Sequence, residues 1–156
     1  MNAQGDYGVY LDCAASTPLD PGVREVFIKH LEQYGNAGSR THDFGRRARS
    51  TTEHARQQVG AVAAASRSEV IFTSGATESD NLAILGLESH ARQTGKHHIV
   101  TTSIEHSAVL GPVGKLERSG FHVTRVDPQP SGQVPAAAIE EALRPDTLLV
   151  SVMHVN

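Results

Sequence analysis

Short apolar runs alternate along the chain with longer stretches in which apolar residues recur every three or four positions. The short runs are typical of buried strands, and the longer stretches are typical of amphipathic helices. The predicted strands are residues 9–11, 70–72, 97–102, 121–126 and 147–155. The predicted helices are residues 21–34, 46–65, 81–93, 106–120 and 135–145. This alternation predicts an α/β fold with a mostly parallel sheet flanked by helices.

Local signals support the predicted ends of the first helix. Asp20 can cap it, Pro21 suits its first turn, and Gly35 is expected to end it. The fourth helix contains glycines, so we expect it to be interrupted.

Ligands of open α/β sheets bind outside the carboxyl ends of the strands. This rule selects three segments, which are SGATES at 74–79, SIEHS at 103–107 and HVN at 154–156. Because the strands are predicted to be parallel, these segments are expected at one edge of the sheet.

The first segment joins a predicted strand to a helix, where free backbone N–H groups and the positive end of the helix dipole suit a phosphate. Gly75 allows close approach of a ligand, and the amides of Ala76 and Thr77 and the Thr77 hydroxyl can donate. A capped turn without a ligand is the alternative interpretation. The known nucleotide-binding glycine motifs are absent, which argues against ATP, GTP and dinucleotides.

Glu105 and His106 in the second segment could form an acid/base pair, or the His106 ring could lie over a conjugated ring. A structural role of His106 is a third interpretation. Cys13 is expected to be a small buried residue rather than a nucleophile. No metal site is expected, because the nine histidines show no metal-binding spacing.

Composition adds limits to this picture. The chain has 156 residues, of which 38% are hydrophobic, and it carries a single cysteine and a formal charge of −3. These values fit one soluble domain without disulfides. We expect a cytoplasmic location, no membrane span and no direct binding of nucleic acid. The arginines between Arg40 and Arg56 are interpreted as a solvated helix face.

Five motifs together resemble the N-terminal half of the large domain of cysteine desulfurases. They are YLDCAAST, GNAGSRTH, FTSGATESDN, SIEHSAV and LLVSVMHVN. These enzymes belong to the class V aminotransferase group of fold-type I pyridoxal-phosphate enzymes. They remove sulfur from L-cysteine, which gives alanine and an enzyme persulfide that a sulfur-acceptor protein receives.

The resemblance implies a role for several residues. It places Ala76 and Thr77 at the phosphate of pyridoxal 5'-phosphate, His106 in a stack on the pyridine ring, and Asn156 near the phenolic oxygen. Asn36 would lie near the substrate and the partner of a homodimer. The resemblance therefore predicts one incomplete domain over residues 1–156. In it, residues 1–45 form the active-site and dimer segment, and residues 46–156 form part of the cofactor-binding domain.

The resemblance also implies what the chain lacks. The Schiff-base lysine, the aspartate that pairs with the pyridine nitrogen and the persulfide cysteine belong to the other half of the family's sequence. We therefore expect the chain alone to be inactive. GNAGSRTH and RPDTLLVSVMHVN look most like the branch that supplies sulfur for DNA phosphorothioation, and iron-sulfur desulfurases are close to it. A selenocysteine lyase, an aminotransferase and a non-catalytic phosphate-binding fragment remain as alternatives.

Overall fold

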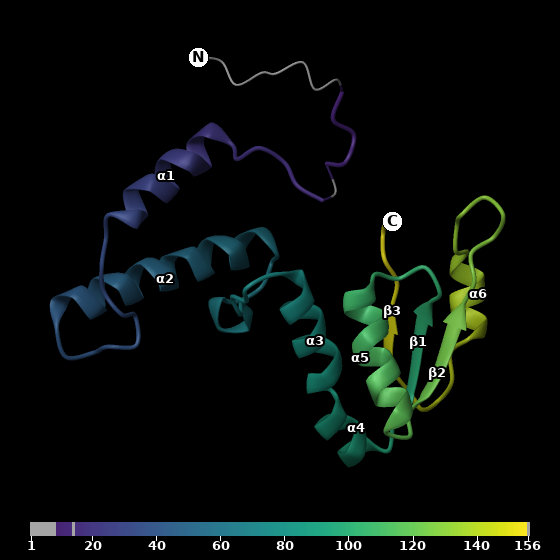
Figure 1. Cartoon of the computed structure of the whole chain (residues 1–156). Coiled ribbons are helices and arrows are strands. Elements are labelled where there is room, and N and C mark those ends of the chain that lie inside the picture. The colour runs from purple at the N-terminus through teal and green to yellow at the C-terminus, as the bar shows by residue number, and fades with distance from the viewer. Residues whose placement is uncertain (1–8, 14, 156) are drawn as a thin grey trace. The chain divides into compact units, whose positions relative to one another are not determined.

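The structure, a computed structural model, describes residues 9–13 and 15–155. Contacts divide the chain between Ile71 and Phe72 into two compact units, called here the N-terminal unit and the C-terminal unit. Figure 1 labels the helices and strands of both units, and each unit is described by itself.

The described residues of the N-terminal unit form three helical segments. They are α1 (Pro21–Leu31), α2 (Asp43–Val62) and the short 3-10 helix η1 (Arg67–Glu69). The Asp20 carboxylate accepts hydrogen bonds from the amides of Gly22 and Val23, and Pro21 is the first helical residue, which confirms the predicted start of α1. The helix ends at Leu31, four positions before the expected Gly35.

The loop between α1 and α2 depends on Gly45 in the first turn of α2. A Cβ atom at Gly45 would lie 2.2 Å from the carbonyl oxygen of Ser39, so no larger residue fits unless the loop moves. The His42 side chain caps α2 by accepting the Gly45 amide at 3.1 Å. This cap explains why the helix begins three residues before the predicted position.

The C-terminal unit holds the sheet. Its elements are α3 (Ala76–Gly86), α4 (Glu88–Thr94), β1 (His98–Thr102), α5 (Ser107–Arg118), β2 (His122–Val126), α6 (Ala136–Glu141) and β3 (Thr147–Ser151). The strand order is β2-β1-β3, and both pairs are parallel. The predicted α/β fold with a parallel sheet flanked by helices is confirmed. The carboxyl ends of the three strands therefore lie at one edge of the sheet.

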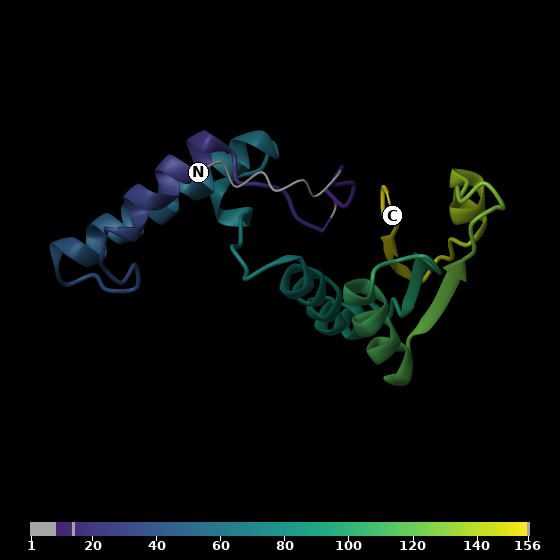
Figure 2. The same cartoon turned by 45° about the horizontal axis from the view of Figure 1, so that its top comes forward.

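The core of this unit lies between the sheet and α5. The central strand β1 is buried along its whole length, as expected of a strand inside a parallel sheet. Ile99, Val113 and Leu116 are fully buried in the apolar cluster, which Ile84 of α3 also joins. In both views α5 lies between α3 and the sheet (Figure 1, Figure 2).

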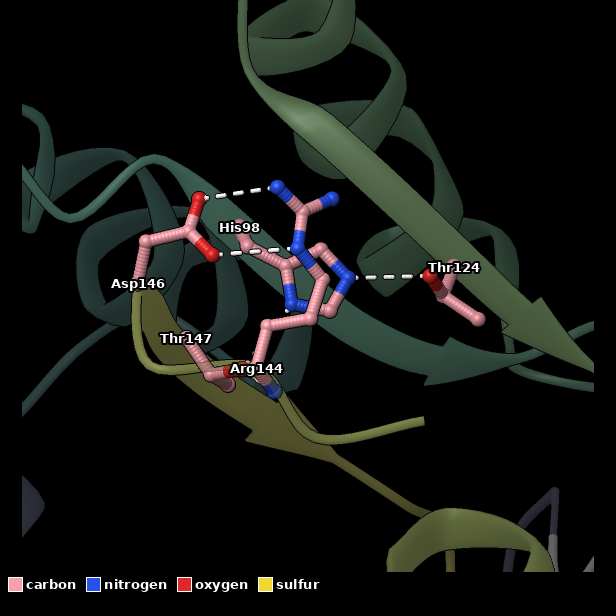
Figure 3. A network of polar contacts seen from close by, with 5 residues as sticks. All are labelled: His98, Thr124, Arg144, Asp146 and Thr147. Atoms are coloured by element: carbon pink, nitrogen blue, oxygen red, sulfur yellow. Dashed lines mark hydrogen bonds and ion pairs between the residues drawn. The ribbon is translucent and has the colours of Figure 1, made fainter. Parts of the chain in front are cut away.

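Toward the amino ends of the strands, the buried side chain of His98 connects neighbouring strands. Its Nδ1 lies 2.9 Å from the Thr147 hydroxyl of β3, and its Nε2 lies 2.9 Å from the Thr124 hydroxyl of β2. One imidazole ring thus connects the central strand β1 to both of its neighbours. Figure 3 shows the ring together with the ion pair of Arg144 and Asp146 in the loop before β3.

Several sequence-based predictions need correction. Residues 9–11 and 70–72 are irregular rather than strands. A strand needs a neighbouring strand for its hydrogen bonds, and within the described residues the ladder consists of β1, β2 and β3. The third predicted helix begins earlier, at Ala76, and is divided into α3 and α4 at Leu87. Conversely, α5 is continuous and contains Pro112, so the expected interruption is wrong.

No helix in the described part of the chain has the length and apolar character needed to cross a membrane.

Candidate functional site

The turn before α3 is fixed by its own side chains. The Glu78 carboxylate accepts the Ser74 amide at 2.6 Å and the Ser74 hydroxyl at 2.7 Å. These two hydrogen bonds, the one from the amide foremost, hold the pKa of Glu78 below its ordinary value. Glu78 is therefore ionised near neutral pH, and the turn is held in place without a ligand.

This capping leaves other donors of the turn available. Gly75 precedes the helix and provides no side-chain cap, and a Cβ atom built on it would meet nothing within 4 Å. Among the described residues, no hydrogen-bond partner is found for the amides of Ala76 and Thr77 or for the Thr77 hydroxyl. The first turn of α3 therefore offers free donors in open space.

His106 has a defined place at the start of α5. Its Nδ1 accepts the Ala108 amide at 3.1 Å, so the ring caps the helix. A ring nitrogen that accepts an N–H carries no proton, which places the proton of the neutral ring on Nε2. The side chain is exposed, so its faces and the Nε2–H remain accessible.

The starts of α3 and α5 line the same hollow, whose volume is about 350 Å³. Thr77 contributes from α3, and Ser107 and Ala108 contribute from α5 directly after His106. Lys115 and Arg118 from the later turns of α5 also line it and add positive charge. The hollow thus has the helix N-termini at one end, which suits an anion there, and the two cations at the carboxyl end of α5.

A second hollow, of about 860 Å³, lies at the carboxyl ends of the strands. It is lined by Thr102 at the end of β1 and Ile104 after it, by residues 128–129 and 131–135 after β2, and by residues 152–155 after β3. Two segments selected from the sequence, SIEHS and HVN, therefore meet here. The sequence analysis did not select the third contributor, loop 128–135. This loop follows the predicted strand 121–126, so the rule that selected the other two segments could have found it.

Among the described residues, the hydrogen bonds of Glu105 go to partners other than His106. Its buried carboxylate accepts the Met153 amide at 2.6 Å and the Thr102 hydroxyl at 3.3 Å. The loop that carries His106 is thereby attached to the segment after β3. The acid/base interpretation of Glu105 and His106 as a directly bonded pair is not supported by these contacts.

The remaining candidate residues lie elsewhere. Asn36 belongs to the N-terminal unit, where its Oδ1 accepts the Gly38 amide at 2.8 Å in a tight turn. Asn156 lies outside the described residues. Cys13 is exposed, so the expectation that it is buried is wrong.

Known proteins resemble this chain closely. Cysteine desulfurase IscS of Stutzerimonas stutzeri is 52% identical over 151 residues, which are 95% of this chain and 37% of that protein. The crystal structure of DndA from Streptomyces lividans has 48% identity and a TM-score of 0.81, and the match covers 95% of this chain and 41% of that one. SspA in complex with cysteine has 40% identity and a TM-score of 0.84, with coverage of 94% and 42%.

The chain therefore spans a little over a third of the length of the curated relatives it matches, 37% of each of the first ones. The profile of the aminotransferase class-V family matches residues 9–156, which is nearly the whole chain. This match and the shared fold lead to one conclusion: the chain belongs to the class-V aminotransferase family.

Proposed function

We propose that this chain forms the phosphate-binding and ring-binding part of a pyridoxal 5'-phosphate site in a cysteine desulfurase. The enzyme would remove sulfur from L-cysteine and give alanine and an enzyme persulfide for sulfur transfer. The observation that carries the proposal is the hollow at which the first turns of α3 and α5 meet. The relatives named as cysteine desulfurases support the same reaction.

The residues present fit the phosphate of the cofactor. Gly75 leaves open space before α3, and the donors of Ala76 and Thr77 have no other partner among the described residues. Hydrogen bonds from a helix N-terminus to a phosphate dianion are charge-assisted and stronger than neutral ones.

When bound, pyridoxal phosphate supplies an electron sink for bond cleavage next to the amino group of the substrate. The role of the chain is to orient the group that supplies this chemistry. Ala76 and Thr77 would hold the phosphate. His106, fixed by its bond to the Ala108 amide, would stack on the ring and present Nε2–H for proton transfer.

Further parts of the proposal extend beyond the hollow. Asn156 would lie near the phenolic oxygen of the cofactor, and Asn36 near the substrate and a second copy of the chain in a homodimer. Residues 1–45 would serve the active site and the dimer, and residues 46–156 the cofactor. A sulfur-acceptor protein in the cytoplasm would receive the persulfide sulfur. The sequence identities to IscS and to DndA are similar, 52% and 48%. Iron-sulfur assembly and DNA phosphorothioation therefore both stay open as pathways.

Cofactor binding by the 156-residue chain tests the proposal. Pyridoxal phosphate should bind more tightly than pyridoxal, which lacks the phosphate, and inorganic phosphate should compete with it. Thr77→Ala removes a charge-assisted donor and should weaken pyridoxal phosphate binding by about 1.5 to 3 kcal/mol. Binding of pyridoxal should change little.

Thr94→Ala is the matched control, because Thr94 is an exposed residue of α4 that does not line the hollow. It should leave binding unchanged. Equal affinity for pyridoxal and pyridoxal phosphate, or equal effects of the two alanine variants, would contradict the proposed phosphate site.

A further inference from the structure

The carboxylate of Glu105 is buried in the loop between β1 and α5, where the side chain is only 8% exposed. Within the described residues it takes part in no ion pair. Its Oε1 instead accepts two hydrogen bonds, one from the Met153 amide and one from the Thr102 hydroxyl. A buried carboxylate without a cation is costly, so both donors are needed to satisfy it.

The bond to Met153 joins segments that are 48 positions apart in sequence, and at 2.6 Å it has the short length of a charge-assisted hydrogen bond. The ladder between β1 and β3 ends at the pair Thr101 and Ser151. Met153 lies two residues beyond that pair. The Glu105 carboxylate therefore continues the connection between the two strands past the point where backbone pairing stops.

One joined segment carries His106, and the other leads to Asn156, which the proposal places near the phenolic oxygen of the cofactor. His106 follows Glu105 directly and caps α5. His154 and Val155 follow Met153 and line the hollow at the carboxyl ends of the strands. A shift at one end of the Glu105 contact would move a site segment at the other end.

We infer that Glu105 is a positioning residue, which holds the segment after β3 at a fixed place relative to His106. The functional part of this inference rests on the proposed cofactor site. The physical link between Glu105 and Met153 can be tested without any cofactor. The two parts can therefore fail separately.

NMR of the Met153 amide in the 156-residue chain tests the link. In the unchanged chain this amide should be protected from hydrogen exchange and shifted downfield, and its shift should follow the ionisation of a carboxyl group. Glu105→Ala should reduce protection about ten- to a hundredfold, as expected for loss of a hydrogen bond to a charged group. Glu105→Gln keeps an acceptor oxygen without charge, so it should retain part of the protection and lose the pH-dependent shift.

Glu117→Ala is the matched control. Glu117 is a carboxylate of α5 that pairs with Arg125, away from Met153. It should leave the Met153 amide unchanged. If Glu105→Ala does not fold, Glu105→Gln alone tests the hydrogen bond between Glu105 and Met153. A Met153 amide shift that still follows a carboxyl ionisation in Glu105→Gln would overturn this link.

The functional readout compares two ligands. Glu105→Gln should alter the absorption spectrum of bound pyridoxal phosphate and weaken its retention, while the affinity for inorganic phosphate at the α3 turn should stay within about twofold. An altered Met153 amide with an unchanged cofactor spectrum and affinity would overturn the positioning role. Failure of the unchanged chain to bind pyridoxal phosphate would overturn the proposed function together with the functional part of this inference, and would leave the NMR result on the link standing.

Discussion

His106 combines two tasks in one residue. Its Nδ1 accepts the Ala108 amide at the start of α5, and its exposed ring belongs to the residue just before Ser107 and Ala108, which line the hollow. A simple truncation would remove the cap and the ring together. An asparagine can also cap a helix, although it has no ring, so it separates the two tasks.

We predict that His106→Ala destabilises the chain and that His106→Asn does so much less. The cap lost in the alanine variant should lower the free energy of unfolding by about 0.5 to 2 kcal/mol. Both variants should change the spectrum of bound pyridoxal phosphate, because both lack the ring. Urea unfolding and absorption spectra measure the two effects. An unchanged spectrum in a folded His106→Asn variant would contradict the proposed stacking.

Thr101 and Thr102 allow a second test at the residue scale. Both lie in β1 and are fully buried. The Thr102 hydroxyl donates to Glu105, whereas the Thr101 hydroxyl has no partner among the described residues. A buried hydroxyl without a partner costs about 1 to 3 kcal/mol of desolvation.

Replacing each threonine by valine, which has a similar volume, should therefore have opposite effects. Thr101→Val should keep or raise the free energy of unfolding, by about 1 kcal/mol. Thr102→Val should lower it, because the Glu105 carboxylate loses one of its two donors. Urea unfolding of both variants gives the comparison. A clear loss of stability in Thr101→Val would show that its hydroxyl has a partner outside the described residues, such as water or a ligand.

At the scale of the elements, the side chain of His98 connects β1 to both neighbouring strands. The Thr147 hydroxyl accepts the Arg144 amide at 2.8 Å, so its own proton can be donated to Nδ1 of His98. The Nε2–H then donates to Thr124. This arrangement suits the neutral ring, whose Nδ1 accepts the Thr147 proton while its Nε2–H donates.

Burial is the main cause that lowers the pKa of His98 from its ordinary 6.5, and the charges of Arg144 and His122 act in the same direction. Asp146 opposes them. The unfolded chain therefore binds the proton more readily than the folded one. The stability contributed by His98 is complete above the unfolded pKa and is lost as the pH falls below it toward the folded pKa.

We predict that the chain becomes less stable between about pH 7.5 and about pH 5.5, and that His98→Gln removes much of this loss. Glutamine can still hydrogen-bond both threonines, but it does not titrate. His90→Gln, at an exposed residue of α4, should leave the loss intact. Urea unfolding at both pH values measures the effect. A pH dependence that is equal in the two variants would contradict the role of His98.

The strands that the sequence pattern predicted well are those that pair with another described strand. The strands 98–102, 122–126 and 147–151 fall within the predicted ranges, because β1 pairs with its two parallel neighbours. Residues 9–11 and 70–72 have the same β-prone composition but lie in irregular segments. The composition of a segment indicates its preference for the strand conformation. A strand also needs a second segment with which it can form backbone hydrogen bonds.

The candidate site shows the same difference. Thr77 and the segment of His106 could be selected from the sequence, because both follow predicted elements at positions where helix N-termini are exposed. The bond between Glu105 and Met153 could not, since nothing local relates residues 48 positions apart. The same is true of His98, whose two threonine partners are known only from the strand order and register.

At the scale of the whole molecule, the chain has three lysines, and the structure places them in different surroundings. Lys29 lies in the last turn of α1, Lys96 lies before β1, and Lys115 lines the hollow between α3 and α5 in the last turn of α5. The resemblance to cysteine desulfurases places none of them in that family's lysine motif. Cys13, the single cysteine, is exposed in an irregular segment.

We therefore predict that the 156-residue chain binds pyridoxal phosphate without converting L-cysteine. A covalent bond between cofactor and lysine and a sulfur nucleophile are both needed for desulfuration, and the chain has neither in the required motif. Sulfide and alanine would be measured with cofactor and reductant present, after mass spectrometry has excluded longer polypeptides. The rate should equal that of free pyridoxal phosphate, and Lys115→Ala should not change it. Turnover above that rate would contradict the prediction, and its loss in Lys115→Ala would identify this lysine, from within the hollow, as the residue that bonds the cofactor.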